Sequence, residues 1–189
     1  MTGETGLFLG LWLRKPLQIA AVCPSGERVA TVLAQLADWR RSGFVLELGA
    51  GTGSLTAGLL EAGCPPERLI AIEGEPALVQ ILRQKFWGNT AIAGDVVELD
   101  QVLLRYAVDR IAVVVSSLPI KWFSVAAQQA VIRPCFERLG PNGRFLQITN
   151  AFSSPVAYRR LGLAGCEAAR VWPNVPPVQI WSYTAPALH

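Results

Sequence analysis

The feature that most constrains this 189-residue chain is a glycine-rich stretch, VLELGAGTGSL at positions 45–55. Its short apolar run predicts a buried strand. The three glycines predict a tight turn whose backbone a ligand can approach closely, because glycine has no side chain. The segment that follows, 54–62, predicts a helix whose first amide groups point back at the loop. Strand, glycine loop and helix together form the first unit of a nucleotide-binding α/β sheet.

The spacing of the glycines distinguishes this loop from two other nucleotide-binding loops. The dinucleotide fingerprint has its third glycine three positions after the second, whereas the spacing here is G-x-G-x-G. A Walker loop is excluded because no Gly-Lys-Ser/Thr follows. An acid followed by x-G-x-G-x-G after a strand instead resembles the first motif of the class I S-adenosylmethionine-dependent methyltransferases.

Apolar periodicity and turn residues predict that strands and helices alternate up to a fifth strand, after which two strands come together. This order also resembles a class I methyltransferase core. The expected fold is therefore a Rossmann-like α/β domain with a mostly parallel seven-stranded sheet, helices on both faces and N-terminal helices. Pro134 predicts a kink or break in its helix, and 140–143 predicts a turn. The expected strands are 44–48, 69–72, 90–93, 110–115, 144–149, 166–172 and 178–183, and the expected helices are 27–41, 54–62, 76–86, 99–106, 125–139 and 155–161.

Composition favours one domain with a large core, since 51% of the residues are hydrophobic and 16% are charged. We expect a single methyltransferase domain over 1–189, with an N-terminal helical extension over 1–43 and a core over 44–189. The net charge of +3 is too small to indicate nucleic-acid binding and is compatible with an anionic membrane surface. The four cysteines form no C-x-x-C pair, so no metal site is expected, and each is predicted to be a small core residue.

The N-terminal segment 5–15 is apolar nearly all round and is ended by Pro16. It is too short to span a bilayer. One interpretation is a helix packed on the core, on a neighbouring chain, or over the cofactor as a lid. The other is an interfacial helix, with Trp12 at headgroup depth and Arg14 and Lys15 on lipid phosphates. No signal peptide is indicated, and a reducing cytosol fits the cysteines.

Ligands of open α/β sheets bind at the carboxyl ends of the strands, where several acids of this chain fall. By resemblance to the methyltransferases, Glu73 accepts from the two ribose hydroxyls of S-adenosylmethionine, and Asp95 accepts from the adenine amino group. The glycine loop passes under the methionine part, and Glu47 holds the loop or meets the ammonium. The expected cofactor-binding residues are Glu47, Gly49, Ala50, Gly51, Gly53, Glu73, Gly74, Asp95, Val96 and Ser116.

Three further runs resemble the bacterial phospholipid N-methyltransferases over nearly the whole chain. The run LWLRKPL at 11–17, continued by AVCPS at 21–25, is similar to the start of that family. The sequence SSLP at 116–119 matches its S-G-L-P after the fourth strand. The run VWPNVPP at 171–177, continued by IWSY at 180–183, matches its closing motif. Ser117 and Ala20 depart from the family glycines, and Ser117 bears on the width of the substrate entrance.

This resemblance implies methyl transfer to the amine of phosphatidylethanolamine and its methylated intermediates, towards phosphatidylcholine. It implies a cytoplasmic protein at the inner face of the cell membrane, held on anionic lipid by the N-terminal helix. The amine must lose a proton before it attacks, and the expected catalytic residues are Ser117, Leu118 through its carbonyl, and Tyr183. Water is an alternative base, whereas His189 is the last residue and is not expected to serve. Aromatic faces favour methylammonium groups, and the candidates are Trp122, Phe123, Trp172, Trp181 and Tyr183.

Two other functions remain open. One is an RNA adenine or small-molecule amine methyltransferase. The related ribosomal-RNA enzymes need an N/D-x-P-aromatic motif after the fourth strand, and residues 116–120 lack both the amide and the aromatic ring. We therefore expect no nucleic-acid partner. The other is a non-catalytic protein of the S-adenosylmethionine-binding fold that binds lipid. The sequence leaves the oligomeric state and the number of methylation steps open.

Overall fold

The computed structural model describes residues 26–38, 40–86, 91–172 and 177–186. The predicted N-terminal helix over 5–15, the turn before Ser25 and the loop 173–176 therefore lie outside the described residues. Across the described ranges, no helix has both the length and the apolar character needed to cross a bilayer.

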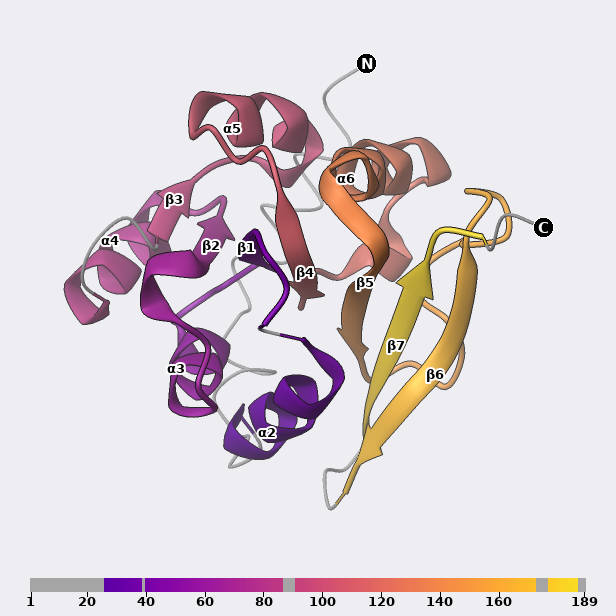
Figure 1. Cartoon of the computed structure of the whole chain (residues 1–189), viewed down its shortest axis with the longest axis horizontal. Coiled ribbons are helices and arrows are strands. Elements are labelled where there is room, and N and C mark those ends of the chain that lie inside the picture. Colours follow the sequence, from indigo (N-terminus) through magenta and orange to yellow (C-terminus); the bar gives the residue numbers. More distant parts are fainter. Residues whose placement is uncertain (1–25, 39, 87–90, 173–176, 187–189) are drawn as a thin grey trace.

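A seven-stranded sheet of order β3-β2-β1-β4-β5-β7-β6 forms the centre of the molecule (Figure 1). The strands are β1 (Phe44–Leu48), β2 (Leu69–Glu73), β3 (Ala91–Ala93), β4 (Ile111–Ser116), β5 (Leu139–Thr149), β6 (Ala164–Val171) and β7 (Val178–Thr184). Strands β1 to β5 pair in parallel, and β7 is antiparallel to both β5 and β6. This confirms the predicted mostly parallel sheet with an antiparallel closing pair. Because β6 opposes β7, it runs parallel to β5 and ends at the same edge.

Helices cover both faces of this sheet (Figure 1). They are α2 (Gly26–Leu36), α3 (Ser54–Glu61), α4 (Pro76–Lys85), α5 (Leu99–Arg105) and α6 (Val125–Arg138). Successive residues of a strand point to opposite faces. Leu46 and Val114 accordingly belong to the core under α5 and α6, whereas Val45 belongs to the core under α2 and α3. Leu33 of α2 packs into the second core, so this part of the predicted extension is integral to the domain.

Two turn regions differ from the sequence prediction. Residues 155–161 form hydrogen-bonded turns and not the expected helix. There the Ser154 hydroxyl donates to the Val156 carbonyl at 2.8 Å, a local bond that competes with helical pairing. The predicted turn at 140–143 lies inside β5, as an irregularity between Leu139 and Arg144, which pair with Ile111 and Val113 of β4.

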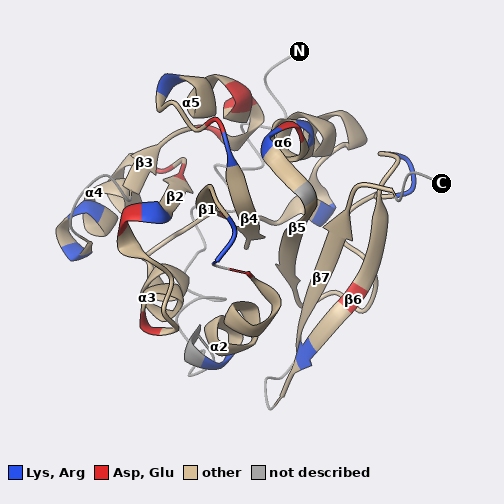
Figure 2. Ribbon diagram, viewed as in Figure 1, with Lys and Arg blue, Asp and Glu red and all other residues tan. Residues whose placement is uncertain are grey.

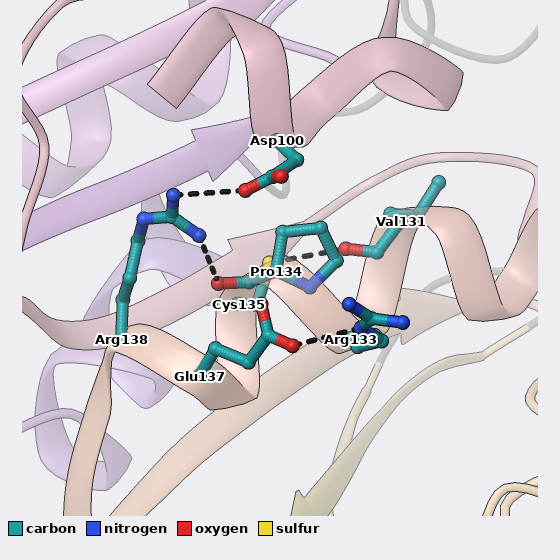
Figure 3. A network of polar contacts seen from close by, with 7 residues as sticks. All are labelled: Asp100, Val131, Arg133, Pro134, Cys135, Glu137 and Arg138. Carbon is teal, nitrogen blue, oxygen red and sulfur yellow. Dashed lines mark hydrogen bonds and ion pairs between the residues drawn. The ribbon is translucent and has the colours of Figure 1, made fainter. Parts of the chain in front are cut away.

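Helix α6 continues through Pro134, so a break in the helix is wrong and only a kink stays a prediction. Polar contacts hold the turns around the proline (Figure 3). Arg138 donates through Nη1 to the Pro134 carbonyl at 3.0 Å and through Nη2 to Asp100 Oδ1 of α5 at 2.8 Å. The Cys135 thiol donates to the Val131 carbonyl at 3.3 Å. Arg138 therefore joins the end of α6 to α5.

Two of the four cysteines confirm the prediction of core positions. Cys64 and Cys135 are buried, and burial raises the pKa of the Cys64 thiol to about 12 and that of Cys135 above its usual range. Cys166 is exposed, so the prediction is wrong for this residue. It lies on β6, the edge strand of the sheet, where most residues keep contact with solvent. Cys23 lies outside the described residues.

The buried side chain of Gln128 connects two loops that follow neighbouring strands. Its Nε2 donates to the carbonyls of Ile120 (3.0 Å) and Phe123 (3.2 Å) in the loop after β4. Its Oε1 accepts from the amide of Ala157, beyond β5, at 2.8 Å. One side chain on the first turn of α6 therefore satisfies three backbone groups and holds the two loops together.

We predict that Gln128→Leu lowers the free energy of unfolding by about 2–4 kcal/mol, because it leaves three backbone groups without their partner. The next residue, Gln129, is exposed on the same helix, so Gln129→Leu is the matched control. We expect that control to change stability by less than about 0.5 kcal/mol. Urea unfolding of both variants measures the difference, and equal midpoints would contradict the role given to Gln128.

Candidate active site

The glycine loop connects β1 to α3, as predicted, and its last glycine is needed for packing. Gly53 is the N-cap of α3 with φ +84°. A Cβ at this position would lie 2.5 Å from the Phe86 ring and 2.8 Å from Leu82 of α4. The amide of Gly53 donates to the Ala50 carbonyl at 3.0 Å, which closes the turn. Gly53 and Ala50 therefore shape the loop from within.

Gly51, in the middle of the loop, faces open space. Its φ is +58°, and a Cβ here would meet no atom within 4 Å. Its amide donates to Glu73 Oε2 at 2.8 Å, which fixes the backbone from one side. The loop is therefore held by a carboxylate and open to a ligand, as the predicted passage under the methionine part of the cofactor requires.

Glu73 ends β2 and is 4% exposed. Besides the Gly51 amide, it accepts the Glu75 amide through Oε1 at 3.0 Å. Each carboxylate oxygen can accept more than one hydrogen bond, so two acceptor positions remain for the hydroxyls of a ribose. The structure therefore places Glu73 where the sequence predicted it and adds a second task, the anchoring of the glycine loop.

Asp95 follows β3 and lies beside the end of β2. The Gly94 amide donates to the Glu73 carbonyl at 3.0 Å, and a Cβ on Gly74 would lie 3.7 Å from the Gly94 carbonyl oxygen. Asp95 Oδ1 accepts from the Val97 amide at 2.9 Å, while the side chain stays exposed. Oδ2 has no hydrogen-bond partner among the described residues and is available to an adenine amino group. The neighbouring Val96 side chain is buried.

Glu47 is fully buried beneath the glycine loop. Thr56 of α3 donates to its Oε2 at 2.7 Å, whereas Oε1 has no partner among the residues that the structure describes. Burial raises the pKa of Glu47 to about 7, against the lowering effect of the Thr56 hydrogen bond, and the negative charge of Glu73 adds to the rise. A cofactor ammonium at Oε1 would satisfy the orphaned oxygen. Thr56 was missed by the sequence interpretation, although it lies in the first turn after the loop.

The loop after β4 is bonded directly to the glycine loop. The Ser117 amide donates to the Leu48 carbonyl at 3.0 Å, and its hydroxyl donates to the Gly49 carbonyl at 2.7 Å. The buried Ser116 hydroxyl accepts from the Leu118 amide at 3.4 Å. Ser117, which stands where the related sequences have glycine, therefore connects the two loops at the predicted substrate entrance.

Two predicted proton acceptors already have hydrogen-bond partners within the chain. The Leu118 carbonyl already accepts from the Ile120 amide at 2.8 Å and from Gln147 Nε2 at 2.9 Å. Tyr183 is fully buried, and it pairs with Phe145 away from the end of β5. Burial raises its pKa to about 12, even though its hydroxyl hydrogen-bonds Ser154 Oγ at 2.7 Å. Both groups already have hydrogen-bond partners, and a role in taking a proton from a substrate stays a prediction for each.

Gln147 is a site residue that the sequence interpretation missed. It lies opposite Ser116 in the β4–β5 pairing and is fully buried. Its Nε2 holds the Leu118 carbonyl, and its Oε1 has no partner within the described ranges. No local sequence signal marks it, because only the pairing of two strands brings it beside the loop.

The five aromatic candidates separate into two groups. Trp181 and Tyr183 stack in the sheet, with ring centroids 6.3 Å apart, and Phe123 is 9% exposed. Trp122, in the loop after β4, and Trp172, at the end of β6, are exposed. A cavity of about 550 Å³ lies at the opposite edge of the sheet, where β4 and β5 begin, and therefore does not belong to this site.

We predict that Gly51→Ala weakens S-adenosylmethionine binding by about tenfold or more, because the added methyl group fills ligand space. Gly63→Ala is the matched control, since Gly63 also has a positive φ and open space but lies beyond α3. Each substitution should cost about 1–2 kcal/mol of stability through the left-handed backbone. Calorimetric titration should then show weaker binding for Gly51→Ala alone, and equal affinities would show that no ligand occupies this space.

We also predict that Glu47 makes the cofactor-free protein less stable as the pH rises. Between its usual pKa of 4.5 and its folded pKa of about 7, the unfolded chain loses this proton while the folded chain keeps it. The free energy of unfolding should therefore fall across this window, by an amount on the order of 3 kcal/mol. Urea unfolding at several pH values should show that the free energy of unfolding falls less across this window in Glu47→Gln than in the wild type. The same slope in both proteins would refute the raised pKa.

Comparisons with known proteins give a family match and several similar sequences. Residues 45–143 match the Methyltransferase domain family. An ornithine lipid N-methyltransferase from Singulisphaera acidiphila is 32% identical over 157 residues, which cover 82% of this chain and 80% of that protein. The chloroplastic ribosomal RNA small subunit methyltransferase of Arabidopsis thaliana is 42% identical over 57 residues, which cover 30% of this chain and 16% of that protein.

Solved structures show the same fold. The glycopeptide N-methyltransferase MtfA superposes with a TM-score of 0.60 at 19% identity, over 85% of this chain and 96% of that one. MtfA complexed with S-adenosylmethionine superposes with a TM-score of 0.52 at 22% identity, over 86% and 68% of the two chains. From the family match, the similarity to a lipid N-methyltransferase and the open glycine loop, we conclude that the chain belongs to the class I S-adenosylmethionine-dependent methyltransferases, with S-adenosylmethionine as its cofactor.

Proposed function

We propose that this methyltransferase methylates the amine of a phospholipid headgroup, namely phosphatidylethanolamine and its methylated intermediates, at the cytoplasmic face of a membrane. The observation that carries the proposal is the 32% identity to an ornithine lipid N-methyltransferase over 82% of the chain. That relative is named for an aminolipid substrate, and the terminal motifs of this chain resemble the phospholipid enzymes. Both point to a lipid amine as the acceptor.

The loop after β4 supports an amine over a nucleobase. Ile120 occupies the position at which the ribosomal-RNA adenine enzymes need an aromatic ring, and it is fully buried. An extruded base needs an aromatic or apolar face on which to stack. No such ring stands at this position, and the ribosomal-RNA relatives match 30% to 39% of this chain. A small aliphatic amine needs no stacking surface.

The residues of the chain act mainly by positioning. When bound, S-adenosylmethionine would supply an electrophilic methyl group to the neutral amine, with the cofactor's thioether as the leaving group. In this proposal Glu73 and Asp95 would hold the nucleoside part, and Glu47 would meet the ammonium. Ser117 fixes the substrate loop against the glycine loop at 2.7 Å. Alignment of two reactants accounts for much of the rate enhancement in such a transfer. Because the Leu118 carbonyl and Tyr183 are engaged, we assign the departing proton to water.

We predict that the protein transfers radiolabelled methyl groups to phosphatidylethanolamine in mixed vesicles, and not to ribosomal RNA or soluble amines. Asp95→Ala should lower cofactor affinity about tenfold, since it removes one hydrogen bond, and lipid methylation should fall with it. Label in RNA or in soluble amines alone would reject the lipid assignment. Cofactor binding without transfer to any acceptor would favour the non-catalytic alternative.

The N-terminal segment gives the proposal a second test in the same assay. Residues 5–15 lie outside the described structure, and their proposed role is an interfacial helix on anionic lipid. Deletion of residues 1–15 should then lower lipid methylation much more than it lowers cofactor affinity in solution. A larger loss of cofactor affinity in the absence of vesicles would identify the segment as a lid.

A further inference from the structure

The exposed large hydrophobic side chains of the described chain are unevenly placed. There are five of them in the described ranges: Leu104, Tyr106, Trp122, Phe152 and Trp172. The last three are 71%, 79% and 62% exposed, and they follow the ends of β4, β5 and β6 in turn. These strands run in the same direction and end at the edge where the glycine loop lies. The other two lie at the end of α5, which leads to the opposite edge.

The three aromatic residues lie along one stretch of that edge. The strands β4, β5, β7 and β6 are neighbours in this order, so the ends of β4 and β6 are ~15 Å apart at the usual strand spacing. Gln128 holds the loops after β4 and β5 together through its bonds to Ile120 and Ala157. Trp122, Phe152 and Trp172 therefore follow strand ends that lie along one stretch of the edge, and we call these three side chains the aromatic rim.

The charge around the aromatic rim favours contact with phosphate groups. The segments 117–124, 150–155 and 172–177 contain one charged residue, Lys121, and no acid. The Lys121 ammonium lies 6.0 Å from the centre of the Trp122 ring. On β6, Glu167 and Arg170 pair with each other at 2.9 Å. Figure 2 shows acidic and basic positions along this strand. The acids Glu73 and Asp95 belong to the other half of the edge, after β2 and β3.

We propose that the aromatic rim is a docking surface for an anionic phospholipid bilayer. Tryptophan is enriched at the boundary between lipid headgroups and acyl chains, because its ring is apolar and its N–H is polar. Three exposed aromatic side chains on separate loops suit the surface of a bilayer, and the 550 Å³ cavity lies at the opposite edge. Lys121 adds attraction to lipid phosphates that salt weakens.

This inference rests on the proposed function and deepens it, because it brings headgroups to the edge where Ser117 and Gly51 lie. It assigns membrane contact to the folded core itself, in addition to any contact made by residues 5–15. Docking through the aromatic rim would bring the lipid amine towards the glycine loop from the side of β4 and β5. The cofactor would then be held by the half of the edge that carries Glu73 and Asp95.

The test uses the full chain and co-sedimentation with vesicles of phosphatidylglycerol, which carry no amine and need no cofactor. We expect the triple variant Trp122→Ser, Phe152→Ser, Trp172→Ser to bind about tenfold more weakly or worse. The control is Leu104→Ser with Tyr106→Ser, which removes exposed apolar side chains from the opposite edge and should bind as the wild type does. Lys121→Gln should reduce the salt-dependent part of binding alone. S-adenosylmethionine affinity, measured by calorimetry, should be unchanged in the triple variant, which reports that it is folded.

Several results would overturn the docking surface. One is that the triple variant binds vesicles as well as the wild type does. Another is that the control variant loses as much vesicle binding as the triple variant. Loss of a protein partner with unchanged vesicle binding would assign the aromatic rim to a protein. Failure of the proposed function gives a different result, since vesicle binding would still depend on the aromatic rim while phosphatidylethanolamine received no methyl group.

Discussion

The hydrogen bond between the Gly51 amide and the Glu73 carboxylate is the interaction on which the site depends. It joins the loop after β1 to the end of β2 at 2.8 Å, with the carboxylate almost fully buried. On the other side, the Ser117 hydroxyl holds the Gly49 carbonyl and so attaches the same loop to β4. Residues that follow or end both neighbouring strands therefore hold the loop, and the space beside Gly51 stays open. A loop that is fixed before its ligand arrives loses little entropy on binding.

Two buried acceptors near this loop have no partner among the described residues, Glu47 Oε1 and Gln147 Oε1. They belong to opposite faces of the sheet, because Glu47 shares its face with Val45 and Gln147 shares its face with Phe145. An unpaired buried acceptor lowers the stability of a folded chain. Both lie at the ends of the central strands, where a ligand can supply the missing donor. The two unpaired acceptors therefore lower the stability of the free chain, and ligand binding can offset this loss.

The side of the sheet at which β1 to β5 end has two chemically different halves. Beyond β2 and β3 lie Glu73 and Asp95, carboxylates suited to hydroxyl and amino groups of a nucleoside. Beyond β4 and β5 lie the exposed rings of Trp122 and Phe152, with no acid in their loops. Ser117 stands where the two halves meet. Under the proposed function, the polar cofactor and the lipid would approach from these two halves and meet at one point.

The sequence by itself determined the order of the strands and of the helices up to β5, the strand–loop–helix unit around Gly51 and the positions of Glu73 and Asp95 at strand ends. Those features follow from hydrophobic periodicity and glycine spacing, which are local properties of the chain. Only the tertiary structure decided that Tyr183 is buried and that Gln147 lies beside the loop after β4. Their environments depend on strands that are distant in sequence, paired in a register that no local pattern encodes. Burial and hydrogen-bond partners arise from that pairing, so the chemistry of these side chains became visible only when the sheet was assembled.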